Sequence, residues 1–116
     1  MAKNYSEHFE QLQNQMQAFA KESPGVMKGM GQLHQGALSM GALSTSTKEL
    51  IALGIGIAAR CESCITLHVK AALVEGATRE EIIETIGVAV LMGGGPSLMY
   101  GIQAHEALNQ FAPSEG

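Results

Sequence analysis

Apolar residues recur at helical spacing along almost the whole chain, and no segment shows the alternation of period two that marks a half-buried strand. The pattern therefore predicts an all-α fold, a bundle of about six helices. Near the N-terminus a narrow apolar stripe repeats at i, i+3, i+7 and i+10, at Phe9, Leu12, Met16 and Phe19. This stripe predicts an amphipathic helix over residues 1–22 that lies against a bundle or a neighbouring subunit.

Two helices are expected in the next part of the chain. Ser23 before Pro24 is typical of an N-cap and a first helical position, and it predicts a second helix that runs toward Leu38. After a loop over residues 39–47, Ser46-x-x-Glu49 fits a capping box and opens a third helix that extends to about residue 60. This third helix is apolar on every side, which predicts that it lies buried at the centre.

The remaining helices have clear start and stop signals. A turn near Cys61 opens the fourth helix, and Gly76 ends it in the C′ position. Thr78 and Glu81 fit a second capping box and open the fifth helix. Three glycines end that helix, and Pro96 then opens the sixth.

Composition narrows the classes of function. The 116 residues predict one domain over residues 1–116. Only 16% of them are charged, well below the usual fraction of about a quarter, while 46% are hydrophobic and seven are methionine. Part of the surface is therefore expected to be hidden in a homo-oligomer. A net charge of −4 with only seven Lys and Arg argues against nucleic-acid binding.

The polarity of the chain segments and the placement of the two cysteines indicate the cellular compartment of the protein. No run approaches the roughly 18 apolar residues that a membrane span needs. Residues 1–19 are polar and rich in glutamine, unlike a signal peptide. The two cysteines stand only two residues apart, so they cannot join distant parts of a secreted fold, and they read more naturally as redox or metal groups in a reducing cytosol. We therefore expect a cytoplasmic protein that binds no membrane.

Candidate chemistry gathers in one motif, E-x11-C-x2-C-x3-H, formed by Glu49, Cys61, Cys64 and His68. The last three fall at i, i+3 and i+7, on one face of a helix. A thiol reacts as its thiolate, so a neighbouring base decides whether the pair is active. At about 1.5 Å per residue, an antiparallel pair of helices brings Glu49 and His68 to about 8 Å apart along the axis. A glutamate side chain and one water could bridge that gap.

Each member of the motif also has a plainer interpretation. Glu49 could serve only as the capping partner of Ser46, and His68 could be a structural histidine. A lone CxxC fits a redox dithiol, half a metal site or two inert buried thiols. No second Cys or His pair follows at zinc-finger spacing. The four residues of the motif could themselves form a four-ligand set, but the long reach to Glu49 disfavours it, so we expect no metal. His34 and His105 have no acidic or thiol neighbours in sequence and are interpreted as surface or interface residues.

The run from Lys48 to Pro96 closely resembles the alkylhydroperoxidase D-like branch of the carboxymuconolactone decarboxylase superfamily. The resemblance is carried by the E-x11-C-x2-C-x3-H motif, by G-A-T-x-E-E-I at residues 76–82 and by the triple glycine before Pro96. It places the family core at residues 24–111. It implies an alkylhydroperoxidase D-like (AhpD-like) helical bundle with the CxxC at the start of a central helix, assembled as a homotrimer or homohexamer.

The resemblance also implies an activity. Similar proteins reduce hydroperoxides through the dithiol, without a bound cofactor, and a lipoyl-bearing or thioredoxin-like protein restores the thiols. Carried over, Cys64 is the peroxidatic cysteine and Cys61 the resolving one, while His68 relays the proton and Glu49 is the general base. Ser63 departs from the best-studied peroxidase members, which carry a histidine at that position. This departure bears on peroxidase competence and leaves the redox pair intact.

The residues alone leave two questions open. A helix N-terminus favours the thiolate of Cys61, whereas the nearby base, His68, favours Cys64, the nucleophile that we prefer. Two other functions remain for the same fold. One is a non-catalytic oligomeric redox switch or binding protein, and the other is a carboxymuconolactone decarboxylase-like enzyme, although that branch lacks the cysteine pair.

Overall fold

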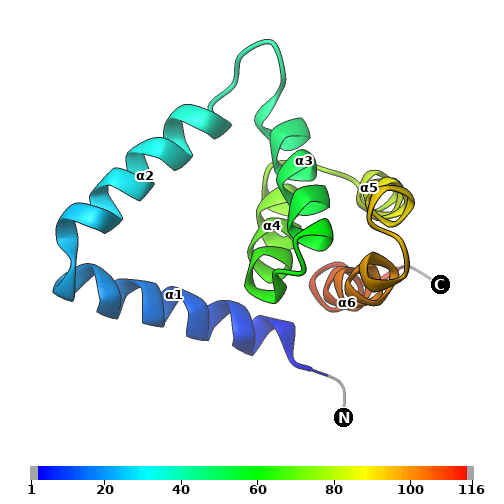
Figure 1. The fold of residues 1–116 in the computed structure, drawn as a ribbon, viewed down its shortest axis with the longest axis horizontal. Helices are drawn as coiled ribbons and strands as arrows, with labels where there is room; N and C mark the ends of the chain where they lie inside the picture. The colour runs from blue at the N-terminus through cyan, green and yellow to red at the C-terminus, as the bar shows by residue number, and fades with distance from the viewer. Residues whose placement is uncertain (1–2, 115–116) are drawn as a thin grey trace.

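The computed structural model describes residues 3–114, which fold into six helices without a strand, so the all-α prediction is confirmed (Figure 1). The helices are α1 (Tyr5–Glu22), α2 (Pro24–Leu38), α3 (Thr45–Ala58), α4 (Glu62–Val74), α5 (Arg79–Gly93) and α6 (Gly95–Phe111). Helices α3 to α6 form a bundle, while α1 and α2 make an arm that stands out from it (Figure 1). In the described part of the chain, no helix is both long and apolar enough to cross a bilayer.

Most of the predicted helix ends are confirmed. Pro24 opens α2, although the hydroxyl of Ser23 makes no capping bond. Gly76 follows α4 with φ +96°, a left-handed conformation that glycine adopts without steric cost. At α5 both bonds of the capping box form between Thr78 and Glu81.

The predicted capping box at the start of α3 is wrong. Ser44 is the N-cap, and its Oγ accepts a hydrogen bond from the Thr47 N–H at 3.1 Å. The run Ser44-Thr45-Ser46-Thr47 offers several hydroxyls in succession, so spacing alone did not fix which one caps the helix. Glu49 is therefore the fifth residue after the N-cap, too far along α3 to be its capping partner. Its side chain points into the fold and is buried.

The core lies between the four bundle helices. Its fully buried members come from every one of them and include Leu53, Ile57, Ile65, Val69, Ile82 and Leu108. The prediction that α3 is a buried central helix holds for one face only: Leu53 and Ile57 are fully buried, whereas Ile51 and Ile55 remain 47% and 64% exposed. Over residues 3–114 of a single chain, nothing covers the second apolar face of α3.

The N-terminal half of α1 is fixed to the bundle by polar contacts. The Tyr5 N–H donates to Gln110 Oε1 on α6 at 2.7 Å, and His8 Nδ1 lies 2.7 Å from Thr66 Oγ1 on α4. Burial lowers the pKa of His8 from its ordinary value, and the Lys3 ammonium lowers it further. His8 is therefore held neutral where α1 meets α4.

This depressed pKa predicts an acid-sensitive attachment of α1. Below about pH 6.5 the unfolded chain binds a proton at His8 more readily than the folded chain does, because the pKa of His8 is lower in the folded chain. The stability that His8 contributes to the fold therefore decreases as the pH is lowered. His8→Gln should lower the melting temperature at pH 7.5, and its deficit relative to wild type should shrink at pH 5.5. Calorimetry at both pH values, with His105→Gln as a control, measures this. A deficit that stays constant or grows would contradict the assignment.

Candidate active site

The two cysteines lie at the turn between α3 and α4. The turn reverses at Arg60, the one non-glycine residue with a positive φ (59°) in the described chain. Cys61 is the N-cap of α4, and its Sγ accepts a hydrogen bond from the Cys64 N–H at 3.2 Å. Cys61 and Cys64 are joined as a disulfide, with their Cα atoms 5.2 Å apart. The predicted position of the CxxC, at the start of a central helix, is confirmed.

This placement has a chemical consequence for Cys61. The first backbone N–H groups of a helix have no partners within the helix, and together they attract negative charge. When the disulfide is reduced, a thiolate at Cys61 faces one of these N–H groups, that of Cys64. Cys61 is thus an anion-stabilised position, which suits both a nucleophile and a good leaving group.

Cys64 packs tightly against Gly56 of α3. A Cβ added to Gly56 on α3 would meet the Cys64 Cβ at 3.0 Å, so a larger side chain at Gly56 would press on the cysteine. Glu49, Leu53 and Gly56 recur at i, i+4 and i+7 on the buried face of α3. The same face that admits Cys64 therefore carries Glu49 two turns away.

Glu49 and His68 meet directly across the two helices. His68 Nδ1 lies 2.7 Å from Glu49 Oε1, so the predicted contact is confirmed, and no bridging water is needed. Glu49 is only 4% exposed, and a buried carboxylate needs such a partner. A carboxylate only accepts hydrogen bonds, so we assign the hydrogen to Nδ1. In the neutral ring Nε2 is then unprotonated and can accept a proton.

His68 also connects this hydrogen bond to the cysteines. It follows Cys64 by four residues, one turn along α4, so both side chains occupy the same face of the helix. The four residues of the motif thus share the contact between α3 and α4: Glu49 and His68 meet across the two helices, and the two sulfurs stand one and two turns before His68 along α4. Their arrangement suits proton transfer beside a redox-active disulfide; the individual roles stay predictions.

The sequence reasoning missed His34. Its ring, on α2, is stacked on the ring of His68, with centroids 6.5 Å apart and planes 12° from parallel. His34 is exposed, as predicted, but it is not remote from the site. Local spacing could not reveal this contact, because α2 and α4 are brought together only by the loop and α3 between them. His105 is exposed on α6, as expected.

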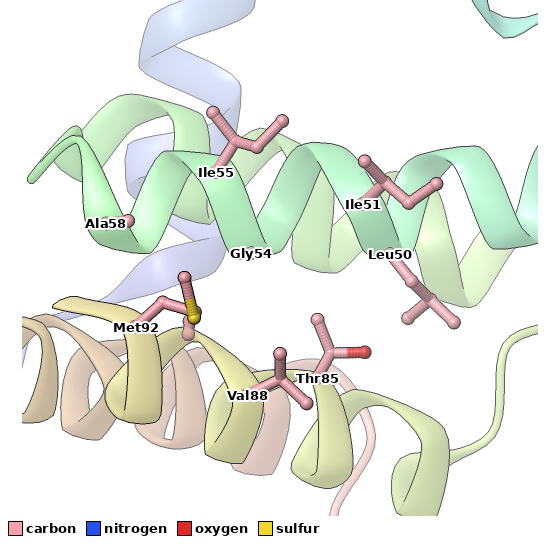
Figure 2. A pocket seen from close by; sticks show the side chains of 9 residues that line it. Leu50, Ile51, Gly54, Ile55, Ala58, Thr85, Val88 and Met92 are labelled. Carbon is pink, nitrogen blue, oxygen red and sulfur yellow. The ribbon is translucent and has the colours of Figure 1, made fainter.

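An apolar groove runs between α3 and α5. It has a volume of about 420 Å³, and Figure 2 shows its side chains facing one another across the two helices. Thr85 supplies the one polar side chain among residues that are otherwise apolar: Leu50, Ile51, Gly54, Ile55, Ala58, Val88, Ala89 and Met92. This α3–α5 groove holds no acid, base or thiol, so it is separate in character from the dithiol site. Over residues 3–114, no group of three or more His, Cys, Asp or Glu side chains is arranged to hold a metal ion.

The chain has clear relatives. The model of the carboxymuconolactone decarboxylase family matches residues 24–107. An uncharacterized protein of Cupriavidus necator is 32% identical over 102 residues, covering 85% of this chain and 90% of the relative. An uncharacterized protein from the cox locus of Paracoccus denitrificans is 41% identical over 70 residues, covering 60% of this chain and 63% of the relative.

Two crystal structures share the fold. A carboxymuconolactone decarboxylase family protein from Legionella pneumophila, in its apo form, superimposes with a TM-score of 0.89 at 44% identity, covering 93% of this chain and 96% of that one. A family member from Thermotoga maritima, for which a part in the antioxidative response has been suggested, gives a TM-score of 0.81 at 26% identity. The latter match covers 90% of this chain and 89% of that one.

Proposed function

This chain belongs to the carboxymuconolactone decarboxylase family, and we propose that within it the protein is a thiol-dependent hydroperoxidase of the alkylhydroperoxidase D-like branch. The observation that carries the proposal is the part-buried hydrogen bond between Glu49 and His68, one helical turn from Cys64 of the disulfide. A structural disulfide needs no base beside it. A catalytic dithiol does, because its thiolate is the reactive form.

In the first step the Cys64 thiolate attacks one oxygen of a hydroperoxide. The O–O bond breaks, the sulfur becomes a sulfenic acid, and the second oxygen leaves as an alkoxide that takes up a proton. His68 accepts the proton of the Cys64 thiol through Nε2, and Glu49 stabilises the imidazolium through Nδ1. The same proton is then available for the departing alkoxide, so the first step yields an alcohol.

In the second step Cys61 resolves the sulfenic acid. Its thiolate attacks the sulfur of Cys64, hydroxide leaves and is protonated to water, and the Cys61–Cys64 disulfide forms. The hydroperoxide has then gained two electrons, and the dithiol has lost them. A separate dithiol, on a lipoyl-bearing or thioredoxin-like protein, returns both electrons by thiol–disulfide exchange, for which the reducing cytoplasm is the natural setting.

Two alternatives use the same fold. A non-catalytic redox switch would also cycle between dithiol and disulfide, but the buried Glu49–His68 pair favours the enzyme over it. A decarboxylase-like enzyme would not need Cys61 and Cys64 at all. Ser63, which stands half-buried between the cysteines, offers no second imidazole, so the relay proposed here rests on His68.

Turnover tests the proposal. Reduced protein supplied with dihydrolipoamide should consume tert-butyl hydroperoxide catalytically, forming one alcohol per dithiol oxidised, and Cys64→Ser should stop turnover. The alcohol and the remaining peroxide are measured by chromatography. A protein whose disulfide cycles with dihydrolipoamide but never consumes peroxide would be a switch, and the hydroperoxidase proposal would fail.

We further propose that the protein is a homo-oligomer, a trimer or a hexamer. Many large apolar side chains are exposed on the single chain. They include Val26, Met30 and Leu33 on α2, Leu91 on α5, and Ile55, Val88 and Met92, which line the α3–α5 groove. Leaving apolar patches of this extent in water is unfavourable. Partner subunits that cover them supply the burial that the monomer lacks, and the family resemblance supplies the number of subunits.

Light scattering measures the mass of the assembly directly. The wild-type chain should have three or six times the 12.2 kDa mass of one chain at micromolar concentration. Ile55→Glu places a charge in the groove and should shift the population toward smaller species, because burying an unpaired carboxylate is costly. Asn14→Asp adds the same charge at an exposed position on α1 and should leave the mass unchanged. A stable wild-type monomer would overturn the proposal.

A further inference from the structure

The contact between His34 and His68 points to a role for α2 in the dithiol site. His68 has side-chain neighbours from two other helices. Glu49 on α3 binds one edge of its ring, at Nδ1, and the ring of His34 on α2 lies nearly parallel to its face. The remaining edge, with Nε2, is the one that the proposed proton transfer needs.

One hydrogen bond does not fix the plane of an imidazole ring. The ring of His68 can still turn about its own Cβ–Cγ bond within the range of angles that the hydrogen bond to Glu49 tolerates, and this turning changes the direction of Nε2. A second ring stacked on its face opposes that motion, since near-parallel aromatic rings attract in offset arrangements. His34 therefore supplies a restraint on His68 that Glu49 cannot.

The end of α2 that carries His34 is itself anchored. Thr45 Oγ1 donates to the Leu38 carbonyl at 2.8 Å, and Lys48 Nζ donates to the Ser39 carbonyl at 2.7 Å. Both bonds join the C-terminal end of α2 to the start of α3, about one turn beyond His34. The other side chains of α2 are mostly exposed, and none is fully buried. These two bonds therefore tie the end of α2 nearest His34 to α3.

We propose that His34 is a positioning residue for the dithiol site. By stacking on His68 it keeps the unprotonated Nε2 directed along α4 toward Cys64, so that the thiol loses its proton readily. The inference rests on the relay in the proposed function, but it concerns the ionisation of Cys64 and not the oxidant. It is the aromatic face of His34, and not its nitrogen atoms, that acts.

The test uses a reaction that needs no peroxide. In Cys61→Ser protein, reduced and otherwise full length, the rate of Cys64 alkylation by iodoacetamide at pH 7 reports how much thiolate is present. Adding His34→Ala should slow alkylation about tenfold, since a small displacement of a catalytic group can cost up to about 10²-fold. Adding His34→Phe, which keeps a flat ring, should stay within about twofold of the parent. His105→Ala, on α6, is the matched control and should leave the rate unchanged.

The pH dependence separates positioning from structural damage. Above about pH 8.5 a free thiol ionises without help, so the deficit of His34→Ala should disappear there if His34 acts through His68. A deficit that persists at pH 9.5 would mean that α2 is simply displaced, and the proposal would fall. Equal rates for His34→Ala and the parent would also overturn it. If His34→Phe is as slow as His34→Ala, the imidazole itself carries the proton, and positioning by the ring face is wrong.

The alkylation experiment gives its result independently of peroxide turnover. If alkylation follows the expected pattern while hydroperoxide is not consumed, the role of His34 stands and the hydroperoxidase proposal fails. If peroxide is consumed at the same rate in wild type and His34→Ala, and alkylation is also unchanged, the proposed function stands and this inference fails.

Discussion

Replacing either Glu49 or His68 by glutamine should slow oxidation of the dithiol near neutral pH by about 10²–10⁴-fold, the usual contribution of a positioned general base. Glu49→Gln keeps the size of the side chain and an oxygen that can accept from His68 Nδ1, but it removes the charge that stabilises the imidazolium. His68→Gln removes the base itself. Stopped-flow measurement of thiol loss after adding hydroperoxide gives both rates.

The pH dependence of these variants is the internal control. Above about pH 8.5 most free thiols are ionised, so neither variant should remain far behind the wild type. His105→Gln should match the wild type at every pH. If Glu49→Gln oxidises as fast as wild type at pH 7, Glu49 is a buried structural partner of His68, and the proton relay proposed for the pair is wrong.

The two cysteine variants should block different steps of the reaction. Cys64→Ser should abolish the fast reaction with hydroperoxide, because it removes the nucleophile beside His68. Cys61→Ser should keep that reaction and stop after it, since no thiol remains to resolve the sulfenic acid on Cys64. Trapping with dimedone followed by mass spectrometry should find the label on Cys64 in Cys61→Ser protein.

A first reaction at Cys61, and not at Cys64, would also have a physical explanation. Cys61 faces the first N–H groups of α4, which stabilise a thiolate without any base. If Cys64→Ser retains the fast reaction and Cys61→Ser loses it, the helix terminus and not the imidazole selects the nucleophile. The roles of the two cysteines would then be reversed.

Much of the fold could be predicted because the helix signals are local. The capping box of Thr78 and Glu81 forms as expected, since a single threonine stands at that position with a glutamate three residues on. At α3 the capping-box pattern indicates Ser46, whereas Ser44 caps the helix, because Ser44 to Thr47 offer four hydroxyls in a row. The meeting of Glu49 and His68 followed from helical rise alone, once the two helices were taken as antiparallel.

Two features depend on contacts that no local pattern encodes. The exposure of Ile51 and Ile55 depends on which faces of α3 this chain covers, and hydrophobicity does not distinguish a core face from a face for a partner. The contact of His34 with His68 depends on the path of the loop between α2 and α3. Neighbours in sequence carried no sign of it, so His34 was interpreted only as a surface or interface residue.

Single-turnover oxidation of the purified wild-type protein tests the central claim most directly. Fully reduced protein is mixed with a limiting amount of tert-butyl hydroperoxide at pH 7, and free thiols, alcohol and the masses of the peptides with Cys61 and Cys64 are followed over time. The account predicts loss of two thiols and gain of one alcohol per hydroperoxide, with an intramolecular disulfide formed far faster than a free thiol is oxidised. Oxidation at the rate of a free thiol, or without equivalent alcohol, would contradict it.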